Sequence, residues 1–220
     1  MIDLHVLPVG AFGLAVADRL ASGRPTVVSP ETDLLQPGRW PRARLRVVAA
    51  WRDTPALFDL VDHLAFVTGT PWLSVTMGAN ALRVGPTVLG GQGPCYRCFL
   101  ARQYQHRQLR ETDRHLLRAY DSDPALGPGG FLDAHVVLAG AVTGQVADTV
   151  LHGDDRAERG RVRSFGLLSA TVSTLSVVPV HGCDRCHRPE PDATWRRLAD
   201  DLRDLTGPVE AAPEPATRRG

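Results

Sequence analysis

The first half of the chain alternates between short apolar runs and segments with helical spacing. The apolar runs have the length and β-branched content of buried strands, and they cover residues 4–9, 26–29, 46–50 and 71–77. Helical spacing appears at residues 14–20 and again after Pro55, where four side chains share one predicted face: Leu57, Leu60, Val61 and Leu64. Asp53 or Thr54 is the expected N-cap of this second helix. Because strands and helices alternate, we expect an α/β domain with a parallel sheet and right-handed crossovers.

The second half has a different order of elements. Residues 80–90 indicate two short antiparallel strands that meet at Gly85 and Pro86. A polar helix from Phe99 to about Arg110, continuing toward Tyr120, precedes a loop rich in proline and glycine. Residues 131–151 are expected to form the longest apolar helix. Four polar residues within it argue against a membrane span: Asp133, His135, Gln145 and Asp148. A β-hairpin is expected over residues 162–168 and 170–180.

The C-terminal part of the chain divides into a helix and a tail. Residues 192–206 have an amphipathic helical pattern whose apolar side chains suit core packing or, as the alternative, a partner helix: Trp195, Leu198, Leu202 and Leu205. The composition after Gly207 indicates a disordered tail. We therefore predict a main domain at 1–190, an amphipathic helix at 191–206 and a disordered tail at 207–220.

Composition narrows the class of protein. The chain has 220 residues, 43% of them hydrophobic, and a net charge of +1, which fits a domain with a substantial core and argues against a nucleic-acid surface. The sequence lacks an apolar run long enough for a membrane span and the basic start of a signal peptide, so we expect a cytoplasmic protein with reduced thiols. All 25 basic residues are arginine, so no lysine ammonium is available to bind a phosphate.

The cysteines form two closely spaced pairs. Cys95 and Cys98 make one C-x-x-C motif, Cys183 and Cys186 make the other, and no further cysteine is present. Two such motifs predict a four-thiolate structural zinc site, because each one directs two sulfur atoms toward one point. The alternatives are two thioredoxin-like redox pairs, two disulfides in an oxidising compartment, or a site in which His187 replaces one cysteine.

A glycine-rich turn follows the first predicted strand. It resembles the dinucleotide fingerprint G-x-G-x-x-G, with Gly10 and Gly13 in the later two positions and Pro8 in place of the first glycine. Proline cannot adopt a positive φ angle and has no N–H to donate to a phosphate. Glu31 lies where a ribose-binding acid is sometimes found, but we prefer to interpret it as a solvated loop acid. The turn therefore indicates a retained fold element more than a working nucleotide site.

Several of these segments together resemble E1-like (ThiF-type) proteins. They are Pro71–Val75, Gly85–Pro86, the Gly93–Cys98 segment G-P-C-Y-R-C, the long helix, the hairpin and the second C-x-x-C motif. The resemblance is strongest to the ThiF-like cyclodehydratase partner proteins of ribosomal peptide natural-product clusters, which make azoline peptides and thiopeptides. It implies a truncated Rossmann-like fold with a mixed sheet, in which a zinc ion bound by the four cysteines connects distant parts of the domain.

The resemblance also locates where an ATP site would lie. It implies nucleotide contacts at Gly10 and Gly13, and it places Asp53 near an activated carboxylate. Adenylating relatives use an asparagine–arginine segment and a lysine between the second and third strands, and this chain has neither there. Their leader-binding winged helix is also missing before the first strand, so we expect a separate protein to supply it.

We therefore expect a noncatalytic zinc-containing scaffold, with no catalytic residues and no ATP. Its expected partners are a precursor peptide, a YcaO-type or related modifying enzyme and a second copy of the chain; nucleic acid and membrane are not expected. The arginine-rich stretch from Arg102 to Arg118 would face an acidic leader peptide, the partner enzyme, or solvent alone.

Three alternatives remain. The first is an ATP-dependent enzyme that adenylates a peptide carboxylate, for which arginine must replace the lysine; the candidates are Arg19, Arg39, Arg42, Arg44 and Arg52. The second is an assembly subunit that binds the enzyme but no peptide. The third is a nicotinamide oxidoreductase, which the altered glycine turn disfavours.

Overall fold

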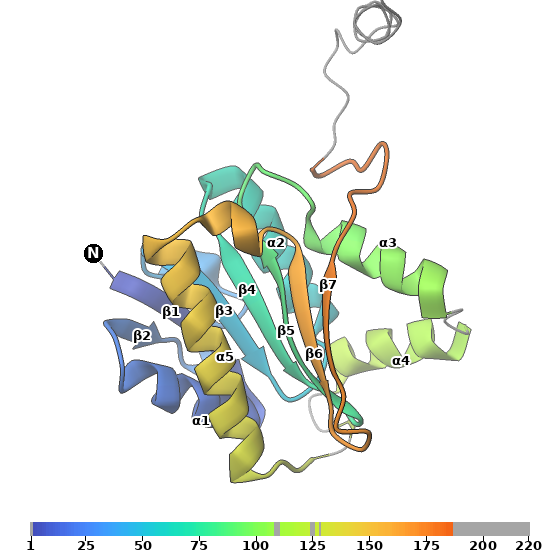
Figure 1. Cartoon of the computed structure of the whole chain (residues 1–220), viewed down its shortest axis with the longest axis horizontal. Helices are drawn as coiled ribbons and strands as arrows, with labels where there is room; N and C mark the ends of the chain where they lie inside the picture. Colours follow the sequence, from blue (N-terminus) through green and yellow to red (C-terminus); the bar gives the residue numbers. More distant parts are fainter. Residues whose placement is uncertain (1, 108–110, 124–125, 128, 187–220) are drawn as a thin grey trace, which may run out of the picture. The chain divides into compact units, whose positions relative to one another are not determined.

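The computed structural model describes residues 2–107, 111–123, 126–127 and 129–186, which form a mixed α/β domain (Figure 1). Its seven strands form one sheet in the order β2-β1-β3-β4-β5-β6-β7. The strands are β1 (Ile2–Val9), β2 (Thr26–Val28), β3 (Ala43–Ala50), β4 (Trp72–Met77), β5 (Ala81–Val88), β6 (Arg161–Gly166) and β7 (Val172–Ser176). The helices are α1 (Gly10–Ala21), α2 (Pro55–Thr68), α3 (Tyr96–Arg107), α4 (Glu111–Ser122) and α5 (Asp133–His152).

The first four strands run parallel to one another, which confirms the predicted parallel sheet. In β1 and β3 the register pairs Ile2 with Ala43 and Val9 with Ala50, so the carboxyl ends of both strands lie at the same edge of the sheet. The topological switch point of the sheet lies between β1 and β3, because the chain places β2 on the far side of β1 and β4 on the far side of β3. In open α/β sheets ligands bind at such a point, beyond the carboxyl ends of the strands. Gly10 and Trp51 follow directly after these two strand ends.

The other strands are antiparallel, and here one prediction was wrong. Residues 81–88 form the single strand β5, not two strands that meet at Gly85 and Pro86. The pairing with β4 shifts register between Leu73 and Val75, and the Ser74 hydroxyl donates a hydrogen bond of 2.6 Å to the Gly85 carbonyl. The irregularity accommodates the proline inside a continuous strand, as β-bulges do.

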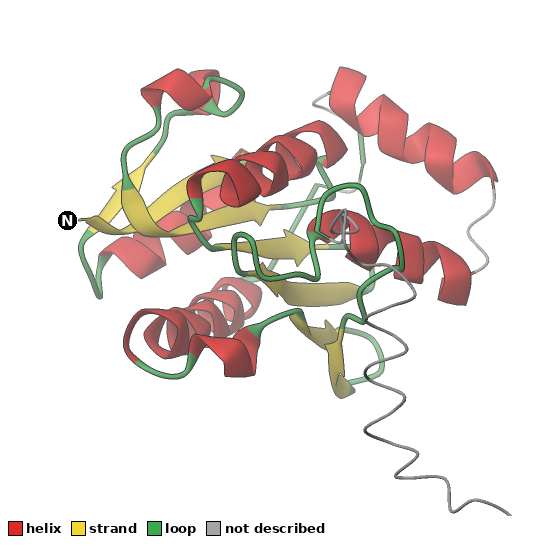
Figure 2. Ribbon diagram, turned by 90° about the horizontal axis from the view of Figure 1, so that it is seen from above, coloured by secondary structure: helices red, strands yellow, loops and turns green. Residues whose placement is uncertain are grey.

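Helices cover both faces of the sheet (Figure 2). On one face α1 and α5 pack on alternate residues of the central strands, such as Leu45, Val47 and Ala49 of β3. On the other face α2 and α3 pack on the intervening residues, among them Val48 and Ala50. This alternation is what a strand with helices on both sides requires, since successive side chains point to opposite faces.

Three helices differ in detail from the sequence prediction. Helix α1 begins at Gly10 and not at Leu14, and α3 begins at Tyr96 and not at Phe99. Thr54 precedes α2 but makes no side-chain capping hydrogen bond. The buried face of α2 is also rotated from the predicted one and consists of Leu57, Phe58, Val61, Asp62 and Ala65. The aromatic Phe58 is preferred to Leu60 on that face, where it packs against Trp72 and Tyr96.

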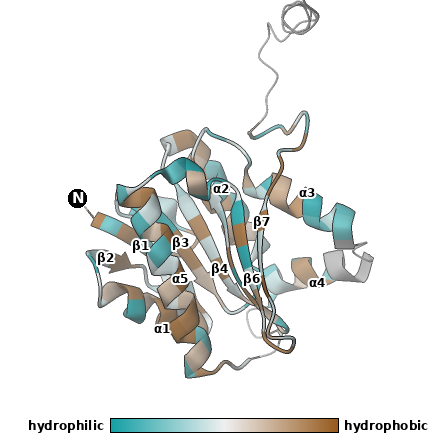
Figure 3. Cartoon of the chain, viewed as in Figure 1, coloured by the Kyte–Doolittle hydropathy of each residue, from teal (hydrophilic) through white to brown (hydrophobic). Residues whose placement is uncertain are grey.

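Among the described helices, α5 alone has the length and apolar content to cross a membrane. Its buried residues include Val136, Ala139 and Val146, which belong to the same core as α1 and the sheet. The role of a core helix accounts for its hydropathy (Figure 3). The amphipathic helix predicted at 192–206, the tail at 207–220 and His187 lie outside the described residues.

Candidate functional site

The four cysteines converge on one point, although 84 residues separate the two motifs (183 − 98 − 1). Cys95 and Cys98 lie at the start of α3, and Cys183 and Cys186 lie in the turn that follows the β6–β7 hairpin. The sulfur atoms are 3.8 Å apart for Cys95 and Cys98, 3.6 Å for Cys95 and Cys183, and 3.3 Å for Cys98 and Cys186. All four are free thiols.

This arrangement fits a tetrahedral metal ion. Four sulfur atoms ~2.3 Å from a central zinc ion would be about 3.8 Å apart, close to the separations here. The Val180 N–H donates to Cys98 Sγ at 3.3 Å, as expected for a sulfur that carries negative charge. Burial raises the pKa of the Cys95 thiol and raises that of Cys186 to about 12, so a bound cation is needed to stabilise their thiolates. Burial opposes ionisation of Cys183, but N–H groups of Cys186 and Arg185 lower its pKa.

An ion-pair network links the second motif to α2. The Arg185 guanidinium, between the two cysteines, is 2.8 Å from Asp62 Oδ2 and 2.9 Å from Asp59 Oδ1. Asp62 is fully buried and also accepts hydrogen bonds from the Trp72 indole and the Tyr96 N–H. Burial raises the pKa of Asp62 despite these three donors. The network therefore makes the position of Asp62, and of the α3 start, depend on where the second motif lies.

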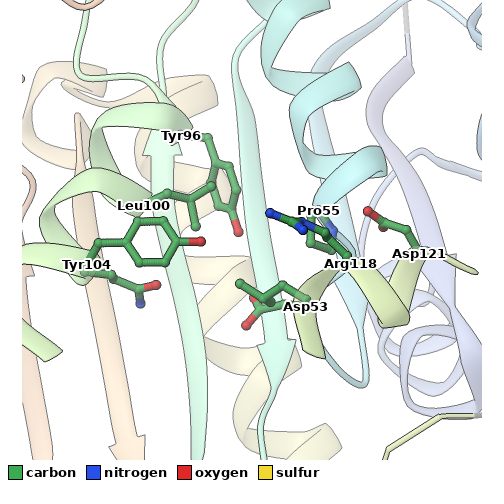
Figure 4. Close-up of a pocket in the computed structure, with 9 residues that line it drawn as sticks. Asp53, Pro55, Tyr96, Leu100, Tyr104, Arg118 and Asp121 are labelled. Atoms are coloured by element: carbon green, nitrogen blue, oxygen red, sulfur yellow. The ribbon is translucent and has the colours of Figure 1, made fainter. Parts of the chain in front are cut away.

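A small pocket of about 240 Å³ opens on the other side of Tyr96, between α3, α4 and the start of α2 (Figure 4). The phenol oxygens of Tyr96 and Tyr104 and the Arg118 guanidinium point toward the space above Asp53. Burial, and then the charge of Asp53, raise the pKa of Tyr96 well above its usual value, so its hydroxyl stays neutral. Asp53 itself is paired with Arg83, whose Nη2 lies 2.6 Å from Asp53 Oδ1.

The turn after β1 is covered by a tryptophan. Gly10 has a φ angle of +67°, and a Cβ atom added there would lie 2.5 Å from Cδ1 of Trp51. Gly13 is pressed equally closely against the Ala49 carbonyl, where α1 packs on β3. Both glycines therefore have a packing role in this chain. Trp51 is the first residue after β3, so its indole lies at the point where the strand order turns.

Arg52 holds the neighbouring segment in place. Its guanidinium carbon lies 5.0 Å from the Trp51 ring centre and 4.3 Å from that of Tyr120. One terminal nitrogen donates to the Tyr120 and Asp123 carbonyl oxygens at 2.8 and 2.9 Å. Arg52 is 5% exposed, and burial lowers its pKa. It thus joins β3 to the end of α4 with neutral oxygens as acceptors.

The other arginines considered for a phosphate lie elsewhere. Arg19 is in the last turn of α1 against Gly140, Arg39 pairs with Asp33, and Arg44 pairs with Asp3 at the amino end of β3. Arg42 directly precedes β3 and is exposed. Arg19 is therefore at the far end of α1 from Gly10, and Arg42 and Arg44 are at the opposite end of β3 from Trp51. Of the five candidates, Arg52 alone follows the carboxyl end of β3.

Comparisons with known proteins show which fold this is. No protein-family model matches the sequence, and no curated protein matches it. Solved structures do. The heterocyclase TruD gives a TM-score of 0.62 at 15% identity, over 90% of this chain and 31% of that chain. MccB of E. coli gives 0.61 at 14% identity, over 87% of this chain and 66% of that chain. This chain therefore has the fold of part of TruD and of part of MccB.

A heterocyclase in complex with substrate and cofactor also matches, with a TM-score of 0.62 and 16% identity over 86% of this chain and 25% of that chain. This chain thus spans less than a third of the heterocyclases and about two thirds of MccB. The expected α/β fold with a mixed sheet is therefore confirmed, and its four cysteines are clustered.

Sequence reasoning missed two residues of the ion-pair network beside the cysteine cluster, Asp62 and Arg185. Asp62 was overlooked because an acid on a helix is ordinarily solvated, yet it occupies the buried face between Phe58 and Ala65. That placement, four residues after one core residue and three before another, was a usable signal. Arg185 gave no such signal, because a charged residue inside a C-x-x-C motif is common at a solvent-facing turn.

Proposed function

We propose that this chain is a noncatalytic E1-like scaffold in ribosomal peptide natural-product biosynthesis, of the azoline or thiopeptide type. It presents a precursor peptide to a YcaO-type or related modifying enzyme. The shared fold supports this assignment, since the similar solved structures include a heterocyclase with substrate and cofactor and MccB with MccA. The chain corresponds to only part of each of these proteins.

The observation that carries the proposal is the contact between Trp51 and Gly10. A nucleotide at this turn would need the space that the indole occupies, and Pro8 offers no N–H to a phosphate. Arg52, the one candidate cation nearby, is held by two carbonyl oxygens and two aromatic rings. Adenylyl transfer depends mainly on positioned charges and backbone donors, and this end of the sheet has few to offer.

The metal in this proposal is zinc in a structural role. Four thiolates fill a tetrahedral shell and leave no position for water, so the ion contributes to folding and not to a reaction. It fastens the turn after β7 to the start of α3.

The second candidate is an ATP-dependent enzyme that adenylates a peptide carboxylate. It is favoured by one comparison, because MccB with ATP is among the similar structures, at a TM-score of 0.59 and 15% identity. In that case Asp53 and the pocket beside Tyr96 would receive the carboxylate, and Trp51 would have to move.

Pyrophosphate exchange separates the two candidates. We expect no ATP-dependent exchange above background with the purified chain, magnesium and the cognate precursor. Exchange that disappears in Asp53→Asn would establish the enzyme instead. A pull-down of labelled precursor peptide with the chain as bait, with and without the modifying enzyme, then distinguishes a peptide-presenting scaffold from an assembly subunit that binds no peptide.

A further inference from the structure

A second cavity, of about 590 Å³, lies between α3 and the β6–β7 hairpin. Phe99, Arg102 and His106 line it from the helix, while Ser164 and Leu175 line it from the strands. Arg83 also contributes to the lining, and it pairs with Asp53, which lines the smaller pocket. We call it the hairpin groove. It does not include the cysteines, Gly10 or Trp51.

The lining of the hairpin groove combines apolar residues with serines, a glutamine, a histidine and two arginines, and none of its residues is an aspartate or glutamate. Arg83 is neutralised by Asp53, but its buried Nε has no described hydrogen-bond partner. The hydrogen bonds described for Arg102 end on neutral oxygens, those of Val178, Pro179 and Gln105. His106 lies one helical turn further along the same face of α3. The groove therefore complements a negative charge next to an apolar side chain.

Within the described part of the chain, one wall of the hairpin groove is an open sheet edge. Strand β7 is last in the strand order, and all five of its residues are exposed. Its sequence, Val-Ser-Thr-Leu-Ser, contains neither the charge nor the proline that usually protects an edge strand. Val172 and Leu175 expose 68% and 61% of their surface. The opposite edge, β2, is only three residues long. Strand β7 can thus pair with an added strand through its main chain.

We propose that the hairpin groove binds an extended acidic peptide segment, which pairs with β7 and places a carboxylate at Arg102 and His106. An apolar side chain of the peptide packs against Leu175. This inference deepens the proposed function, on which it rests, by naming where the scaffold holds a peptide and which charge that peptide carries. Pairing of β7 with a second copy is disfavoured, because it would bring two cationic grooves together.

The test uses capped synthetic nonapeptides with a fluorophore, read by fluorescence anisotropy. One probe alternates glutamate with valine around a central phenylalanine, and a second has lysine in place of each glutamate. We expect the acidic probe to bind and the basic probe to bind at least about tenfold more weakly, with the affinity for the acidic probe falling as salt rises. Hydrogen exchange at the β7 amides should slow when the acidic probe is bound.

Two variants of β7 give a matched comparison. Leu175 faces the groove and Val172, three residues earlier, faces the other side of the sheet. Leu175→Ala should weaken binding of the acidic probe about tenfold, while Val172→Ala should change it less than about twofold. Arg102→Gln should remove most of the salt dependence. Melting temperatures of all three variants identify any loss that is due to unfolding.

Equal binding of the two probes, or equal effects of the Leu175 and Val172 substitutions, would overturn the assignment. Concentration-dependent dimerisation that protects the β7 amides without peptide would also overturn it and assign the edge to a second copy. These outcomes are separable from those of the proposed function. ATP-dependent exchange would refute the scaffold and leave the groove intact, whereas failure of the acidic probe would refute the groove alone.

Discussion

Arg185 and Asp62 are 123 residues apart in the sequence, and they form an ion pair of 2.8 Å in which the carboxylate is fully buried. The pair joins the second cysteine motif to α2. A buried carboxylate that loses its counterion remains desolvated, so breaking such a pair costs more than the pair itself contributes. The connection between the cysteine cluster and the core therefore depends on a side chain that is not itself part of the cluster.

Replacing this arginine should be severely destabilising. We expect Arg185→Met to lower the free energy of unfolding by about 3–5 kcal/mol, because Asp62 keeps only its two neutral donors. Urea unfolding measures the change. Arg97→Met is the matched control, since Arg97 also pairs with Asp59 but is 42% exposed at its side chain. It should cost at most about 1 kcal/mol. Similar losses in the two variants would show that Asp62 does not depend on Arg185.

The cysteines should behave as one metal site. We expect about one zinc per chain by elemental analysis, and we expect Cys95→Ser to lose the metal and several kcal/mol of stability. Cys183→Ser should do the same. The double variant Cys95→Ser, Cys183→Ser should be little worse than either single variant, because the first substitution already opens the shell. Additive losses, or an unchanged metal content in either single variant, would contradict a shared site.

Trp51 and Gly10 should be energetically coupled. Gly10→Ala forces a side chain into a positive φ angle and against the indole, so we expect a loss of about 2–4 kcal/mol. The additional substitution Trp51→Ala should relieve the collision but not the backbone strain, which leaves a measurable coupling energy. Gly38→Ala is the control, because Gly38 has no neighbouring atom within 4 Å of an added Cβ. Strict additivity of the two substitutions would show that the indole is displaced easily.

The sequence was sufficient for features that depend on local spacing. The apolar runs predicted the parallel strands, and each C-x-x-C motif marked two neighbouring thiols that can bind one ion. The union of the two motifs in one cluster was predicted from their matching spacing, since the chain has no other cysteine. Gly10 and Gly13 likewise marked the turn after β1. The continuity of β5 could not be predicted, since Pro86 indicates a break unless a partner such as Ser74 satisfies the Gly85 carbonyl.

The contacts around the site join residues that are far apart in the chain. They could not be predicted from the sequence. Nothing local indicates that Trp51 covers Gly10, that Arg52 binds the end of α4, or that Arg185 reaches Asp62. Each contact forms only when the chain folds and brings together segments that are distant in the sequence and share no sequence signal.

Stability should also fall in mild acid because of a buried histidine. His5 is fully buried between β2 and β3, where Arg46 Nε donates to its Nδ1 at 3.0 Å and its Nε2 is 2.8 Å from Ser29 Oγ. The ring must therefore be neutral, with its hydrogen on Nε2 directed at Ser29. Burial, and then the Arg46 charge, lower the pKa of His5 from 6.5 to about 4. Protonation of His5 Nδ1 would remove the acceptor of the Arg46 hydrogen bond and place a second positive charge beside the guanidinium.

The direction of the pH effect follows from this depressed pKa. Below pH 6.5 the unfolded chain binds a proton that the folded chain refuses, so the free energy of unfolding falls as the pH drops toward about 4. At pH 5 the loss relative to pH 7 should reach about 2 kcal/mol. Urea unfolding at the two pH values measures it. His5→Gln should flatten the dependence, while His63→Gln, at an exposed position of α2, should leave it unchanged. An equally steep dependence in His5→Gln would place the responsible proton elsewhere.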